Sequence, residues 1–92
     1  MSYTSDLVLE MNTLLRFDLA TDQQGIKIHT TADIGVIGAT QRLFAKGLIT
    51  QVDGGYLTSL GRDAAEHAQT LLSILTTVPA RAIPVGSEVR AA

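Results

Sequence analysis

Three polar side chains within one short stretch are of the types that contact DNA: Gln41, Arg42 and Lys46. Arginine and glutamine form bidentate hydrogen bonds with the edges of guanine and adenine. The small neighbours Ala39 and Ala45 would let a helix approach the major groove. We therefore predict that these five residues lie on or near the exposed side of a recognition helix. The alternative interpretation is an ordinary solvated helix face.

Two further cations could contribute phosphate contacts. Arg62 would lie at the start of a helix, where it could instead pair with Asp63 or Glu66. Lys27 would lie with His29 on a short strand, and edge strands often carry such residues to discourage aggregation. A structural role is therefore the alternative for both cations.

The overall charge argues against strong, autonomous binding to nucleic acid. The 92 residues include seven basic and nine acidic side chains, which give a formal net charge of −2. Proteins that hold a phosphate backbone usually carry a clustered positive excess, because neutralising phosphates supplies most of the non-specific affinity. Double-stranded DNA is one candidate partner, and another protein chain is the second.

Catalytic and metal-binding constellations are not evident in the sequence. The chain has no cysteine, and its two histidines, His29 and His67, lack the spacing of metal ligands. Thr58 and Ser59 have no paired base nearby in the sequence and are better explained as helix caps. We predict no enzymatic activity, no metal or cofactor, and no small-molecule ligand.

Length and hydropathy describe one small domain. Hydrophobic residues make up 46% of the chain, which is enough for a compact core. The N-terminus lacks the basic region of a signal peptide, and no apolar run approaches the roughly 20 residues of a membrane span. We expect a cytoplasmic protein with a domain at 1–76 and a flexible C-terminal tail at 77–92.

Three helices are predicted from apolar spacings of three and four residues. The first covers 5–17, the second runs from about residue 30 to Lys46, and the third spans about 60–76. Gly47 stands where a helix often ends in a left-handed conformation. The candidate N-caps are Thr4 or Ser5, then Thr30, Thr31 or Asp33, then Thr58 or Ser59. The expected stripes are Leu7, Met11, Leu14 and Leu15; Val36, Ile37, Thr40, Leu43 and Phe44; and Leu60, Ala64, His67 or Ala68, Leu71 and Leu75.

A β-hairpin is predicted between the second and third helices. Residues 48–52 and 55–58 alternate as strands do, and residues 53–55 read Asp-Gly-Gly. Such steps favour a tight reversal, because a type I′ turn needs positive φ at both central positions. A further short strand is expected at 26–29.

The end of the third helix is unusually rich in aliphatic side chains. Leu71, Leu72, Ile74 and Leu75 are four large apolar residues in five positions. They cannot all face one small core from a terminal helix, so one or two should be exposed in a monomer. We predict a homodimer through this helix, to which the first helix could contribute. The alternative is that the first helix covers these side chains.

Two phrases of the sequence resemble the winged helix-turn-helix domains of bacterial regulators. Residues 43–49 match the step from a helix into the wing, and residues 55–62 match its Leu-Thr-x-x-Gly-Arg exit into the next helix. Gly47 would permit the sharp turn, Thr58 would cap, and Gly61 would allow close packing. The resemblance implies a winged helix-turn-helix-like fold, mainly α with a small antiparallel hairpin, in the order α-β-α-β-β-α.

Most of residues 1–76 also resembles a small family of uncharacterised bacterial proteins, some of which are labelled DNA-binding proteins or regulators on fold grounds. The function implied is that of a DNA-binding transcriptional regulator. The alternative is a dimeric protein–protein interaction module of winged-helix fold without DNA binding.

Two features depart from a standard winged helix. Only 30–46 is available for the helix-turn-helix pair, so its first helix would be a short turn around 32–38. Gly35 and Gly38 favour such a turn, because each weakens a helix by about 1 kcal/mol relative to alanine. The second departure is the wing tip, where Asp53 stands in place of lysine or arginine.

Overall fold

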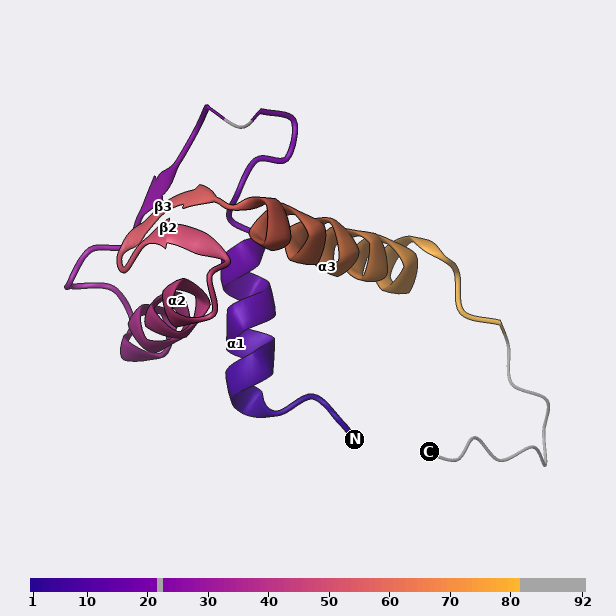
Figure 1. The fold of residues 1–92 in the computed structure, drawn as a ribbon. Coiled ribbons are helices and arrows are strands. Elements are labelled where there is room, and N and C mark those ends of the chain that lie inside the picture. The colour runs from indigo at the N-terminus through magenta and orange to yellow at the C-terminus, as the bar shows by residue number, and fades with distance from the viewer. Residues whose placement is uncertain (22, 82–92) are drawn as a thin grey trace.

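The computed structural model describes residues 1–21 and 23–81. It is mainly α with a three-stranded antiparallel sheet, as predicted, and its order is compatible with a winged-helix-like arrangement. Figure 1 shows α1 between α2 and α3, with the sheet above α2. The elements are α1 (Ser5–Leu14), β1 (Ile26–Lys27), α2 (Ile34–Ala45), β2 (Ile49–Gln51), β3 (Gly54–Leu57) and α3 (Ser59–Thr77).

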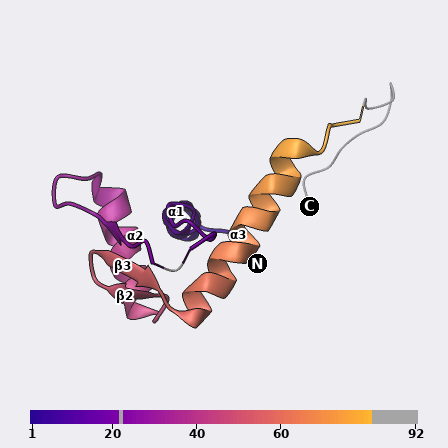
Figure 2. The same ribbon diagram turned by 90° about the horizontal axis from the view of Figure 1, so that it is seen from above.

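The first helix is the central element of the domain. Thr4 caps α1 as predicted, because its hydroxyl accepts a hydrogen bond from the Leu7 amide at 3.2 Å. The helix ends at Leu14, three residues before the predicted end. The next turn tightens instead, and the Phe17 amide donates to the Leu14 carbonyl at 3.2 Å. The view from above also places α1 between α2 and α3 (Figure 2).

The second helix is continuous, so the expected separate turn at 32–38 is wrong. Its glycines lower intrinsic helix propensity, yet the helix is held by tertiary packing, which supplies most helical stability in proteins. Ala39, Thr40 and Leu43 are fully buried along one side of α2. The structure therefore has one helix, not a pair, between β1 and the hairpin.

The end of α2 is a Schellman motif. Gly47 has φ of +77°, as its predicted position beyond the helix requires. The Gly47 amide donates to the Phe44 carbonyl and the Leu48 amide to the Leu43 carbonyl, both at 3.0 Å. These bonds satisfy the last carbonyls of α2 and turn the chain directly into β2.

The predicted hairpin is present, with its reversal one residue earlier than expected. Gln51 pairs with Gly54, so residues 52–53 form the tip. Positive φ occurs at Gly54 (131°) and Gly55 (73°), after the tip, where β3 holds one extra residue as a bulge. β3 is the middle strand, because β1 pairs along its other edge and opposes the same two glycines.

The start of α3 explains the Leu-Thr-x-x-Gly-Arg phrase. The Thr58 hydroxyl accepts from the Gly61 amide at 3.0 Å and donates to the Gly47 carbonyl at 2.7 Å. A side-chain carbon on Gly61 would overlap the carbonyl oxygen of Leu48. Arg62 extends back to donate to the Leu19 carbonyl. The residues of this motif therefore hold the start of α3 against the hairpin and against the loop after α1.

The core forms where α1, α2, the hairpin and the start of α3 meet. Its buried members are Leu14, Phe17, Leu43, Ile49 and Ala65. Five positions of the predicted apolar stripes are wrong as core positions, because Leu7, Phe44, Leu60, Leu71 and Leu75 are exposed. On α3 the buried side is that of Gly61 and Ala65, whose small size lets the helix backbone approach β2 and the core.

Candidate interaction surfaces

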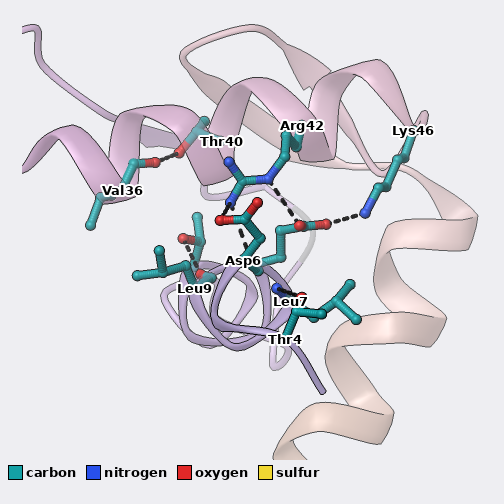
Figure 3. Close-up of polar contacts among 10 residues, drawn as sticks. Thr4, Asp6, Leu7, Leu9, Val36, Thr40, Arg42 and Lys46 are labelled. Carbon is teal, nitrogen blue, oxygen red and sulfur yellow. Dashed lines mark hydrogen bonds and ion pairs between the residues drawn. The ribbon is translucent and has the colours of Figure 1, made fainter. Parts of the chain in front are cut away.

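The predicted DNA-contacting cations, Arg42 of α2 and its C-cap residue Lys46, point toward α1. Arg42 Nε donates to Glu10 Oε2 at 3.0 Å, and Lys46 Nζ donates to Glu10 Oε1. Arg42 Nη2 also lies 3.3 Å from the backbone oxygen of Asp6 and 3.7 Å from its carboxylate. Figure 3 shows Arg42 and Lys46 reaching from α2 toward the helix that carries Asp6. Two carboxylates of α1 therefore neutralise the two cations of α2.

Glu10 is the electrostatic centre of this contact. Its side chain is only 7% exposed, whereas those of Arg42 and Lys46 are 34% and 48% exposed. Burial alone would raise the pKa of Glu10, but the hydrogen bonds and charges of Lys46 and Arg42 lower it, and the net pKa is below its ordinary value. Glu10 is thus an ionised carboxylate that joins two helices.

Sequence reasoning missed Glu10, although a signal was present. Asp6 and Glu10 are four residues apart on α1, and Arg42 and Lys46 are four residues apart on α2. Residues at this spacing share one helix face. Two matched pairs of opposite charge on neighbouring helices therefore indicate a helix–helix contact as readily as a DNA-binding surface.

The expected exposed side of α2 needs correction. Ala39 is fully buried and Arg42 is half-buried against α1, so neither lies on an open recognition face. Gln41, Ala45 and Lys46 are exposed, as predicted, although Lys46 is paired with Glu10. The error arose because propensity and spacing do not show which side of a helix a preceding helix covers.

The two remaining candidate cations have separate environments. Arg62 is half-buried, and within residues 1–21 and 23–81 it forms no ion pair with Asp63 or Glu66 but donates to the Leu19 carbonyl. Lys27 is exposed on β1, an edge strand of the sheet, as expected. The predicted strand at 26–29 is too long, because β1 ends at Lys27; His29 therefore lies just beyond the strand, where it is also exposed.

A groove between α2 and the hairpin tip has an apolar lining. Its volume is about 460 Å³, and its walls include Ile28, Ile34, Ile37 and Val52. Ile34 is 84% exposed beside this groove. The titratable side chains that line it are those of His29 and Asp53. The groove favours apolar contacts, and its carboxylate would repel a phosphate.

The second half of α3 carries a large exposed apolar surface, which we call the α3 patch. All four predicted dimer residues are exposed, and Val78, which sequence reasoning missed, extends the surface. The exposed fractions are 39% for Leu71, 46% for Leu72, 53% for Ile74, 70% for Leu75 and 63% for Val78. Figure 1 shows this half of α3 projecting away from the other elements.

Beside the α3 patch lies a small depression, the α1–α3 hollow. Met11 and Leu15 of α1 line one wall, and Leu71, Leu72 and Leu75 of α3 line the other. Its volume is about 140 Å³. α1 therefore contacts the near part of the patch without covering it.

The described part of the chain has neither a metal-binding cluster nor a helix that could span a membrane. Within residues 1–21 and 23–81, no group of three or more His, Cys, Asp or Glu side chains could hold a metal ion. Over the same residues, even the 19-residue α3 lacks the combination of length and hydrophobicity that a transmembrane helix needs.

Comparison with known proteins places the chain in one family. The model of a family of unknown function (DUF5669) matches residues 1–76, so the chain belongs to that family. No curated protein and no solved structure matches the chain.

Proposed function

We propose that this member of a family of unknown function is a dimeric protein–protein interaction module of winged-helix-like fold. The observation that carries the proposal is the α3 patch, which projects from the domain and is apolar over two helical turns. An exposed apolar surface of this size on a small soluble domain marks an interaction site.

The environment of α2 supports a protein partner over DNA. Arg42 and Lys46, the cations best placed for a recognition helix, are paired with Glu10. Releasing them for phosphate contacts would leave a buried carboxylate without its partners, which is strongly unfavourable. The groove between α2 and the hairpin tip adds apolar walls and the Asp53 carboxylate where DNA would need cations.

A DNA-binding transcriptional regulator is the second candidate. The α-β-α-β-β-α order favours it, as do exposed Gln41 on α2 and exposed Lys27 on the edge strand. Such a regulator would have to bind DNA with few cations that are not already engaged in ion pairs.

The dimer is tested by light scattering on the wild-type chain and on Leu75→Asp. We expect the wild type to have the mass of two chains, and the variant the mass of one, because a buried carboxylate without a partner opposes association. Leu60→Asp is a matched control, since Leu60 is also exposed on α3 but lies outside the patch. A wild-type monomer at high protein concentration would contradict the proposal.

DNA binding is tested with duplex DNA at low and high salt. The interaction-module proposal predicts no binding that depends on Arg42 or Lys46. Binding that falls steeply with salt and is weakened by Arg42→Ala or Lys46→Ala would favour the regulator instead.

A further inference from the structure

We propose that two copies associate through antiparallel α3 helices, and that each copy inserts an aliphatic side chain into the α1–α3 hollow of the other. This inference rests on the proposed dimeric function and specifies the partner surface.

The spacing of the patch is that of a helix–helix seam. Leu71 and Ile74 of α3 and Val78, its C-cap, recur at intervals of three and four, and Leu75 lies beside them. Such a row forms one face of a helix and packs into the grooves of a facing helix. In the first half of α3 the side of Gly61 and Ala65 faces the core. In the second half no comparable cover exists among the described residues, because Leu71–Val78 are all exposed.

The charge distribution fits a second copy of the same surface. A two-fold axis places a surface against itself, so any charged residue near the axis would face a like charge. Positions 67–80 contain no Asp, Glu, Lys or Arg. The hydroxyls of Thr70, Thr76 and Thr77 donate to carbonyls one turn earlier at 2.9, 2.7 and 2.5 Å. These polar groups already have partners and can be buried at small cost.

The α3 patch presents more than half of the area that one partner buries in a standard dimer interface. From their exposed fractions, the five side chains of the α3 patch present on the order of 500 Å² of surface. A standard interface buries about 800 Å² per partner, so the α3 patch alone can supply more than half of that area.

The antiparallel direction follows from the helix dipole and from the position of α1. The last turn of α3 has no basic residue to offset its negative end, so two parallel helices would bring like ends together. In a parallel pair, the remaining elements of both copies would also lie at the same end of the interface between the two α3 helices. In an antiparallel pair, the end of one α3 reaches the hollow of the other copy.

The hollow has room for one side chain. Its volume of about 140 Å³ is near the roughly 150 Å³ of an apolar protein cavity that holds one benzene molecule. With the axis between Ile74 and Leu75, Leu71 lies opposite the Val78 of the second copy. Val78 or Leu75 of that copy would then enter the hollow beside Met11.

Single-cysteine variants of the full chain test this geometry, since the natural sequence contains no cysteine. Under mild oxidation, Ile74→Cys and Leu75→Cys should each form a covalent dimer, seen as a doubling of mass, because these positions lie next to their own copies across the axis. Leu71→Cys alone and Val78→Cys alone should not, because identical residues would be about 10 Å apart along the helices, too far for a disulfide. A mixture of these two variants should form the mixed dimer.

Leu60→Cys, exposed on α3 outside the patch, measures the background of random cross-linking. Self-linking of both Leu71→Cys and Val78→Cys would show a parallel pair and overturn the inference. Non-covalent dimers that link at none of these positions would overturn it while leaving the dimeric function intact. A monomeric wild type would remove both.

Discussion

The two sides of α1 differ in how they meet their neighbours. On the α2 side, Glu10 binds Arg42 and Lys46, and the contact is closed and charged. On the α3 side, Met11 and Leu15 line a hollow that remains open and apolar. Charged groups that could recognise an external ligand are therefore used inside the domain, whereas apolar groups that usually form a core are left outside it.

This difference shows why residue type alone misdirects a functional assignment. Arg42 resembles a DNA-contacting residue in the sequence, but in the structure it is paired with a carboxylate of α1. Leu75 resembles a core residue in the sequence, but it is exposed because its part of α3 projects away from the other elements. The free surface of a small domain is what remains after its helices have paired, so neighbouring elements decide which residues can act.

The largest expected effect on stability comes from removing the charged contact between α1 and α2. Glu10→Ala should lower the free energy of unfolding by about 2–3 kcal/mol, because it removes a buried carboxylate and two charge-assisted hydrogen bonds. Urea denaturation measures the loss. Glu66→Ala, at an exposed acidic position on α3, is the control and should change stability by less than about 0.5 kcal/mol. Equal losses in the two variants would show that the contact with α2 contributes little.

Acidification should produce a related, smaller effect. The pKa of Glu10 is lowered in the folded state, so its contribution to stability is complete above the pKa of the unfolded chain, about 4.3. That contribution should disappear as the pH falls through the lower, folded-state pKa. Unfolding measured as the pH is lowered from neutral through the unfolded pKa and below it should therefore depend less on pH in Glu10→Gln than in the wild type. Parallel profiles would contradict this assignment.

A substitution on the apolar side of α1, which faces α3, should have the smallest effect on stability. Met11→Ala removes a half-buried side chain from the wall of the hollow, so we expect a loss of about 1 kcal/mol in the stability of the monomer. The dimer of this variant should also dissociate at a higher protein concentration than the wild-type dimer, since the hollow loses one wall. Light scattering over a concentration series measures this. Unchanged dissociation would mean that the hollow receives no partner side chain.

Much of the fold could be predicted because local physics determines it. Thr4 and Thr58 cap helices, Gly47 ends α2 with positive φ, and the glycines of 53–55 mark the hairpin. Each of these features depends on a few adjacent residues. Errors occurred where long-range packing decided the outcome, as in the continuity of α2 despite its glycines.

The candidate surfaces were predicted unevenly for the same reason. Counting apolar residues against the size of the core predicted that one or two of Leu71, Leu72, Ile74 and Leu75 would be exposed, and in the structure all four are. The pairing of Glu10 with the cations of α2 depends on which helix faces which. Sequence spacing gives the faces of a helix but not the partner of each face.

Hydrogen exchange of backbone amides, measured at low and high protein concentration, tests the central claim most directly. Exposed helix in a monomer should exchange faster than the same helix in an interface. We predict that amides of the α3 patch, residues 71–78, become more protected as concentration rises, while those of β1 do not change. Protection that is independent of concentration along the whole of α3 would contradict a dimer formed by this helix.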